Sequence, residues 1–348
     1  MLRWGAWMPC VVQALSLAHL PRSVLASVTG EMLGNPAAIC SIRLCSISGF
    51  DRRINDVVYC FPLIRSDEVS TVVFFGGDVQ DFPENMETHR DNKNYVKWNL
   101  ENTATLLHTY FPESHIVVVR PSRMEMKTFS CYDNFVPCNN SGAPNHTPMH
   151  HALQHLEQLL RGVSQRLQAM PASELARSMS SIPEELQASQ DAGEETQMWW
   201  QKDLCLEKSK LILIGFSKGC VVLNQFIYEF HYLKTLTPDD ESMANLVDQI
   251  QDMYWLDGGH AGGKNTWITS RSLLETLTRL NIGIHIHVTP YQINDDRRPW
   301  IRKEEKAFGD LLRRLGAPVH RVVHFENQVS SLCTHFEVLS VFHQAEAK

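Results

Sequence analysis

The sequence predicts an α/β fold in which a mostly parallel sheet is covered by helices on both faces. Three observations indicate it. Short continuous apolar runs at 71–75, 115–119 and 211–214 are typical of strands buried on both faces. Helical patterns separate the later runs, so strands and helices alternate along the chain. A serine flanked by glycines, Gly215-Phe216-Ser217-Lys218-Gly219, directly follows one of the runs.

The elements follow in order. We expect early strands at 39–47, 56–61, 71–75 and 115–119, with a helix at 95–110 before the last of them. A helix is expected at 149–170, and a partly flexible insertion at about 121–205 precedes the strand that carries the serine. The later strands are expected at 253–256, 283–288 and 319–325, separated by helices at 269–280 and 300–315.

Composition excludes several classes of protein. The chain has 348 residues, of which 43% are hydrophobic and 20% charged, as in a globular domain. Its net charge of −7 gives no sign of a nucleic-acid footprint, so no nucleic-acid partner is expected. The nine cysteines include no C-x-x-C pair, which argues against a zinc site of the usual spacing. We expect neither a metal nor an organic cofactor.

The first thirty residues differ from the rest. They contain Arg3 and Arg22 and no acid, and residues 4–20 are uncharged and mostly apolar. This run is short for a membrane span of about 20 residues, so we expect a cleavable leader at 1–30 before a single domain at 31–348. The apolar middle favours a secretory leader and the arginines without acids favour a mitochondrial one. The sequons at Asn139 and Asn145 would matter only in the secretory pathway.

The serine motif predicts the nucleophile elbow of an α/β-hydrolase, because an apolar strand precedes it and a helical segment follows. Such a turn is so tight that the serine is strained, and the flanking glycines let the backbone pass close to strand and helix. The hydroxyl of Ser217 would then project at the carboxyl edge of the sheet. The alternative is an ordinary strand-to-helix turn with a capping serine.

A hydrolase of this class needs an acid and a histidine after the serine in the chain. His335 follows the last expected strand and opens a final helix, so it is the expected general base. We expect the acid at Asp295, beside Asp296, in the loop after the penultimate strand. Asp257, at the end of the preceding strand and before two glycines, is the alternative.

The oxyanion hole requires backbone N–H groups. One should come from Lys218, and the other from Gly77 or Asp78 in the loop after the third strand. The Lys218 side chain opposes the helix dipole at this position. We expect it to reach solvent, with pairing to Asp78 or Asp257 as the alternative.

Other histidines are given structural interpretations. His285 and His287 alternate on a strand, which predicts packed histidines on one face of the sheet. His151 and His155 have a spacing that metals can use on a helix. Because no H-E-x-x-H arrangement accompanies them, a solvated helix surface is expected there.

Several sequence blocks together carry a family resemblance. They lie at 77–80, 122–124, 129–136, 214–225, 253–260 and 287–292. Through them the chain resembles a vertebrate group of mitochondrial, serine-hydrolase-like proteins named after an open reading frame on human chromosome 2. The resemblance implies a relative of lipases and esterases whose leader directs it to mitochondria, with Asp295 in the acid loop and His335 as the terminal histidine. It supplies no physiological substrate.

The expected function is therefore a mitochondrial serine hydrolase, in the matrix, that cleaves an ester or thioester of a small-molecule or lipid acyl substrate through Ser217, His335 and Asp295. No transmembrane span is expected in the mature chain. The alternative is a hydrolase-fold protein whose activity is weak or lost and which serves as a binding or regulatory partner of another protein.

Overall fold

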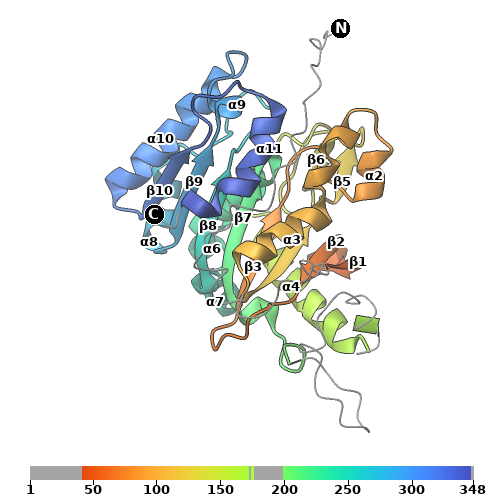
Figure 1. Ribbon diagram of the computed structural model, residues 1–348. Helices are drawn as coiled ribbons and strands as arrows, with labels where there is room; N and C mark the ends of the chain where they lie inside the picture. Colours follow the sequence, from red (N-terminus) through yellow and green to blue (C-terminus); the bar gives the residue numbers. More distant parts are fainter. Residues whose placement is uncertain (1–40, 172–173, 176–198, 346–348) are drawn as a thin grey trace.

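The computed structural model describes residues 41–171, 174–175 and 199–345. The predicted leader at 1–30 and the whole segment 176–198, within the predicted insertion, lie outside the described residues. The described chain is built around one large sheet of eight strands, which twists through the centre of the molecule (Figure 1).

The sheet has the order β1-β2-β4-β3-β7-β8-β9-β10. Strands β1 and β2 pair antiparallel, β2 runs antiparallel to β4, and every later pairing from β4 to β10 is parallel. This is the α/β-hydrolase fold that the sequence predicts. The strands are β1 (Ile42–Ser48), β2 (Ile54–Cys60), β3 (Ser70–Phe75), β4 (Ser114–Val119), β7 (Lys210–Phe216), β8 (Ile250–Leu256), β9 (Gly283–Val288) and β10 (Val319–Val323).

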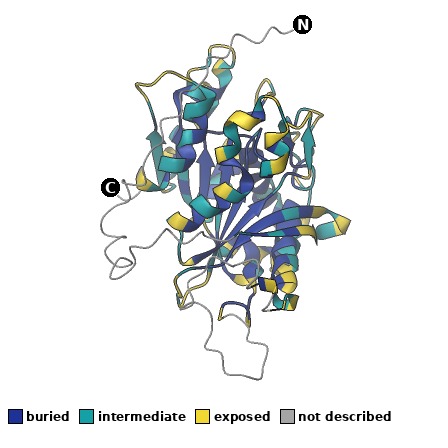
Figure 2. Ribbon diagram, turned by 45° about the vertical axis from the view of Figure 1, so that its right-hand side comes forward, coloured by how far each residue is buried: buried dark blue, intermediate teal, exposed yellow. Residues whose placement is uncertain are grey.

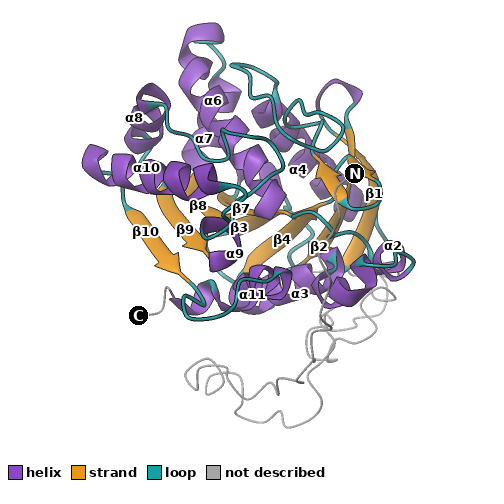
Figure 3. Cartoon of the chain, turned by 90° about the horizontal axis from the view of Figure 1, so that it is seen from above, coloured by secondary structure: helices purple, strands orange, loops and turns teal. Residues whose placement is uncertain are grey.

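Helices cover both faces of the sheet (Figure 3). One face carries α4 (Ala152–Ala169), α6 (Cys220–Leu236), α7 (Glu241–Gln249), α8 (Arg271–Arg279) and α10 (Pro299–Leu315). The other carries α3 (Leu100–Tyr110) and α11 (Leu332–Val341). Shorter pieces are α2 (Pro83–Glu87), α9 (Pro290–Ile293), η1 (Phe50–Arg52), η2 (Asn92–Trp98), η4 (Leu206–Lys208), η5 (Ser217–Gly219) and η6 (His343–Ala345).

Alternation along the strands divides the core into two layers. On β3, Val73 and Phe75 face the α6 side while Val72 and Phe74 face the α3 side, and all four are fully buried. The central strands consequently lie in the dark interior of the molecule, between helices whose outer sides are exposed, while the edge strands β1 and β10 are less buried (Figure 2). Continuous apolar runs are what a sheet covered on both faces requires.

The segment predicted as an insertion at 121–205 is ordered over its described part. It begins with a small antiparallel hairpin of β5 (Arg123–Glu125) and β6 (Phe129–Cys131). Helix α4 follows, and Leu153, Leu156 and Leu160 bury its apolar side in the core. Much of this stretch is therefore part of the core. Within the described ranges, no helix has both the length and the apolarity needed to cross a membrane.

Candidate active site

The turn after β7 has the strained geometry of a nucleophile elbow. Ser217 has a φ of +51°, in the left-handed region that non-glycine residues seldom occupy. A Cβ added at Gly219 would lie 1.9 Å from the carbonyl oxygen of Phe75, and one at Gly215 would lie 2.9 Å from Cα of Cys220. Both glycines of the motif are therefore required by the close passage of strand β3 and helix α6.

His335 forms a hydrogen bond with Asp257. His335 lies in the first turn of α11, and its Nδ1 is 2.6 Å from Oδ2 of Asp257. Both residues are buried, with 3% and 0% exposure. Thr289 donates to the same carboxylate twice, from its backbone N–H at 2.7 Å and from its hydroxyl at 2.6 Å. The carboxylate is thus fixed in place, and an acid so placed can hold the Nδ1–H tautomer of the imidazole.

The expected acid, Asp295, has a different set of contacts. Its carboxylate accepts from Nε of Arg297 at 3.1 Å and from Nε of Arg298 at 2.8 Å. Burial alone would raise the pKa of Asp295, but the hydrogen bonds from the two arginines lower it to about 2. The described contacts thus pair His335 with Asp257, the alternative acid, while these arginines bind the carboxylate of the expected acid Asp295. Asp296 beside it is exposed.

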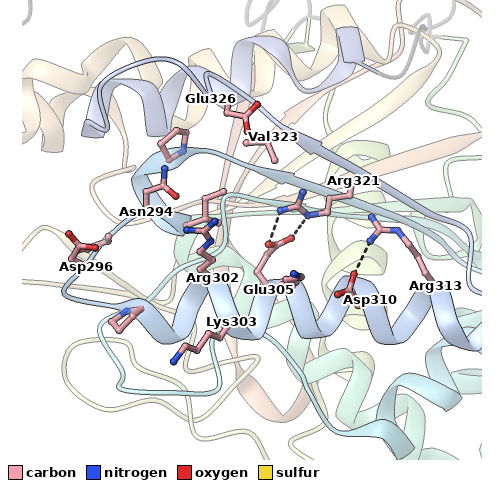
Figure 4. A pocket seen from close by; sticks show the side chains of 15 residues that line it. Asn294, Asp296, Arg302, Lys303, Glu305, Asp310, Arg313, Arg321, Val323 and Glu326 are labelled. Atoms are coloured by element: carbon pink, nitrogen blue, oxygen red, sulfur yellow. Dashed lines mark hydrogen bonds and ion pairs between the residues drawn. The ribbon is translucent and has the colours of Figure 1, made fainter.

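Asp295 and Asp296 line a cavity of about 800 Å³ between α9, α10 and β10 (Figure 4). Arg321 and Glu305 form a two-point ion pair along its wall, at 2.6 and 2.9 Å. Ser217 is not among the residues that line this cavity. The cavity is therefore separate from the serine and its histidine.

The imidazole of His335 is held between two aromatic rings. The ring centroids of Phe216 and Tyr291 each lie 4.7 Å from that of His335. Because Phe216 directly precedes Ser217, this contact brings His335 to the same edge of the sheet as the serine.

The sequence interpretation missed Thr289, Tyr291 and the role of Phe216. One signal was present, since Thr289-Pro290 is a typical start of a helix, with the threonine as N-cap. A threonine at that position, at the end of strand β9, can also reach the end of the neighbouring strand β8. Asp257 lies there, and its N–H donates to the carbonyl oxygen of His287 on β9.

The loop after β3 lies against the serine. A Cβ added at Gly77 would be 2.7 Å from Cβ of Ser217, so only glycine allows this approach. The N–H of Gly77, however, donates to Oε1 of Gln80 at 2.9 Å. Gly77 is consequently a poor oxyanion donor, contrary to expectation, because this N–H is already engaged. The backbone N–H groups of Asp78 and Lys218 stay candidates.

Residues in and just after β6 hold the loop after β3 in place through hydrogen bonds. Ser130 donates its hydroxyl to the carbonyl of Gly77 at 2.6 Å and its N–H to Oδ1 of Asp78 at 2.8 Å. Tyr132 donates its hydroxyl to the carbonyl of Gly76 at 3.0 Å. These bonds give the polar stretch at 129–136 a structural role that apolar packing alone does not require. They hold the backbone beside Ser217 in one conformation.

The Lys218 side chain is fully buried, so the expectation that it reaches solvent is wrong. Its Nζ donates to the carbonyl of Ser141 at 2.8 Å and lies 3.4 Å from Oδ1 of Asp78. Burial raises the pKa of Asp78, and the neighbouring ammonium opposes that rise. Pairing with Asp78 was the alternative expectation, and it offsets the cost of burying a cation.

The histidines at the start of α4 are also less exposed than expected. His155 is fully buried, with Nε2 at 2.8 Å from Oδ1 of Asn55 and Nδ1 accepting from the N–H of Phe50 at 3.2 Å. His151 is half-buried and stacks on the ring of Phe50. This end of the helix packs on the core and does not form a solvated surface.

The structure is similar, at low sequence identity, to solved structures of esterases. The structure of esterase Est22 is 14% identical and covers 90% of this chain and 80% of its own, with a TM-score of 0.44. Brefeldin A esterase, described as a bacterial homologue of human hormone sensitive lipase, is 12% identical with a TM-score of 0.40, covering 97% of this chain and 86% of its own.

Full-length relatives are much closer in sequence. The mitochondrial protein C2orf69 homolog of Mus musculus is 40% identical over 359 residues, covering 96% of this chain and 95% of its own. The Danio rerio homolog is 36% identical over 346 residues, covering 95% and 94%. Mitochondrial protein C2orf69 of Homo sapiens is 38% identical over 289 residues, covering 78% and 74%. The C2orf69 family pattern matches residues 43–318. The resemblance indicated by the sequence blocks is confirmed, and the chain belongs to the C2orf69 family.

Proposed function

We propose that this protein is a mitochondrial serine hydrolase that cleaves an ester or thioester through Ser217, His335 and Asp257. The observation that carries the proposal is the buried pair of Asp257 and His335, whose imidazole contacts the ring of Phe216, the residue before the strained Ser217. Strained backbone at a buried polar cluster is typical of functional sites. Asp257 itself has a φ of +48°, so two of the three residues share this property.

In the proposed reaction, Oγ of Ser217 attacks the acyl carbonyl carbon while Nε2 of His335 takes its proton. The negative charge that develops on the carbonyl oxygen is met by the backbone N–H groups of Lys218 and Asp78. The intermediate collapses to an acyl-enzyme as His335 returns the proton to the leaving alcohol or thiol. Water, deprotonated by His335, then releases the acid and restores Ser217.

The proposed location rests on the relatives and on the leader. The three full-length relatives are named mitochondrial proteins. The first thirty residues carry two arginines and no acid, which suits a mitochondrial transit peptide, and we propose the matrix as destination. A small-molecule or lipid acyl group is the proposed substrate. Glycans on Asn139 or Asn145 of the expressed protein would instead indicate the secretory pathway.

A hydrolase-fold protein with little or no activity, acting through a protein partner, is the second candidate. Lys218 favours it, because a buried ammonium joined to Asp78 and Ser141 is a structural use of the residue beside the nucleophile. Ser217 is only 7% exposed. Neither cavity described in the structure, of about 800 and 500 Å³, includes Ser217 among its lining residues.

A fluorophosphonate probe separates the two candidates, because it reacts only with an activated serine. The hydrolase is expected to be labelled, and Ser217→Ala and His335→Ala should abolish labelling while leaving the far-ultraviolet circular dichroism spectrum unchanged. Ser272→Ala, which removes an exposed hydroxyl on α8, is the matched control and should label like the wild type. A folded wild type that takes no label would favour the inactive candidate.

A further inference from the structure

Three histidines converge on the α11 side of the sheet, at its parallel edge. One ring nitrogen from each of His285, His287 and His320 lies within 4.8 Å of the other two. His285 and His287 are two residues apart on β9 and so point to the same face. His320 lies on the edge strand β10, directly opposite His285 in the parallel register. The three imidazoles are thus brought together by strand pairing.

Two of these imidazoles are oriented by hydrogen bonds on the far side of the ring. Nε2 of His285 is 2.8 Å from Oδ1 of Asp252, and Nδ1 of His287 is 2.9 Å from Nε2 of His324. The nitrogens turned toward the cluster are therefore Nδ1 of His285 and Nε2 of His287. Both are shielded from solvent, as is Nδ1 of His320.

This arrangement matches the way proteins support metal-binding histidines. Such a histidine donates a hydrogen bond from the N–H of its second ring nitrogen to a carboxylate or another acceptor, which fixes the ring orientation and the tautomer. Asp252 has that position behind His285. Gly283 makes room for it, because a Cβ there would lie 2.0 Å from Oδ1 of Asp252. The sequence thus leaves space at the one point where the supporting carboxylate must sit.

We propose that His285, His287 and His320 bind a divalent transition metal, for which Zn²⁺ is the probe, with water in the fourth position. Neutral imidazole is a preferred ligand of Zn²⁺, Co²⁺ and their neighbours. Nitrogens that share one tetrahedral Zn²⁺, each at about 2.0–2.1 Å, lie roughly 3.4 Å apart. The three nitrogens lie within 4.8 Å of one another, so they would have to approach by up to about 1.4 Å to share one ion.

The surroundings of the cluster suit a bound ion. A metal binds the neutral form of an imidazole ring. The ring of Tyr254 covers His285, with centroids 4.0 Å apart and planes nearly parallel. A bound ion would tie β9 to the edge strand β10.

The sequence motifs that argued against a metal site concern only local spacings. C-x-x-C and H-E-x-x-H place ligands on one turn or one helix. Here His285 and His320 come from two strands and meet only through the sheet register. The proposal does not depend on the hydrolase function, since neither Ser217 nor His335 takes part.

The test is Zn²⁺ binding by the full chain without a histidine tag, stripped of metal with a chelator and titrated in competition with a fluorescent zinc indicator. The wild type should bind about one equivalent, and Co²⁺ should give the visible absorption of a tetrahedral site. His320→Asn, a change at a half-buried edge position, should weaken binding by at least about tenfold, and Asp252→Asn by roughly 10–100-fold.

The matched control is His231→Asn on α6, whose ring bonds to Thr276 on the opposite face of the sheet. It should bind Zn²⁺ like the wild type. The proposal is overturned if the wild type binds well below one equivalent, or if His320→Asn and His231→Asn bind equally well. Should His320→Asn fail to fold, Asp252→Asn decides, because its carboxylate is one-third exposed and supports the site without contacting the ion.

Discussion

At the residue scale, Ser217 and Asp257 share an unusual backbone. Both have φ near +50°, and each such non-glycine residue costs on the order of 1–3 kcal/mol. The cost at Ser217 is enforced by the close passage of β3 and α6 around the two glycines. At Asp257 it is accompanied by three hydrogen bonds to the carboxylate, from Thr289 and His335. The surrounding contacts thus hold both residues in this strained backbone conformation, which a loop residue without such contacts would leave.

The two candidate acids can be separated by paired substitutions. Asp257→Asn removes the acceptor that orients the imidazole, and we expect fluorophosphonate labelling to slow by roughly 1,000-fold or more. Asp295→Asn loses only its pairs with Arg297 and Arg298 and should label at the wild-type rate. Labelling rates at equal protein concentration, with folding checked by circular dichroism, give the answer. The opposite order would restore Asp295 as the acid.

The sequence interpretation named both acids and preferred Asp295 because of its position in the chain and because the family resemblance implied it. The hydrolase pattern places the acid after the penultimate strand, which favoured Asp295. Which carboxylate meets His335 depends on the distance between the ends of β8 and β9 and on the hydroxyl of Thr289, and neither is visible in a linear pattern. The adjacent Arg297 and Arg298 were a usable signal, since arginines next to an aspartate in the sequence can form ion pairs with its carboxylate.

At the element scale, the loop at 76–80 lies between the elbow and the hairpin of β5 and β6. Ser130 and Tyr132 bond to its backbone from one side, and Ser217 contacts Gly77 from the other. The sequence predicted the loop from its two glycines. It gave no indication that the stretch at 129–136 would fix it, because those contacts span more than fifty positions.

Substitution of Gly77 tests this packing. In Gly77→Ala the new Cβ would lie 2.7 Å from Cβ of Ser217 and 3.0 Å from the Phe216 ring, so loop and elbow must separate. We expect the unfolding free energy to fall by about 1–3 kcal/mol, as in other overpacked sites, and labelling of Ser217 to slow more than tenfold. Urea unfolding and labelling rates measure the two effects.

Gly263→Ala is the control for that experiment, because a Cβ at Gly263 meets no atom within 4 Å. It should leave both the unfolding free energy and the labelling rate at wild-type values. Equal behaviour of the two alanine variants would show that the close approach of Gly77 to Ser217 is absent in solution.

At the scale of the whole molecule, a mostly parallel sheet with helices on both faces followed from the sequence, because continuous apolar runs specify a sheet covered on both faces. The order of the strands within the sheet did not. The extent of the core was underestimated at 121–205, where α4 joins it. That stretch carries many polar residues, and only its spacing of leucines, such as Leu153, Leu156 and Leu160, marks the buried side. Several histidines are also buried, although polar side chains are usually expected at the surface.

These buried histidines predict how stability depends on pH. Burial lowers the pKa of His108 and His260 to about 4 and of His115 and His155 to about 3, from an ordinary value of 6.5. Between those values the unfolded chain binds more protons than the folded one, so stability falls as pH drops below 6.5. Each histidine contributes at most about 1.4 kcal/mol per pH unit.

Urea unfolding at about pH 7.5 and about pH 5 measures the effect, and the midpoint should be lower at the acidic value while the slope stays constant. Equal unfolding free energies at the two values would mean that these imidazoles are solvated in the native protein or protonated within it.

Mapping the fluorophosphonate adduct on the folded protein shows whether Ser217 is an activated nucleophile. Mass spectrometry of proteolytic peptides should find a single adduct, on Ser217, that is absent in His335→Ala. An adduct on a different residue, or folded wild-type protein that stays unmodified, would show that Ser217 is not activated.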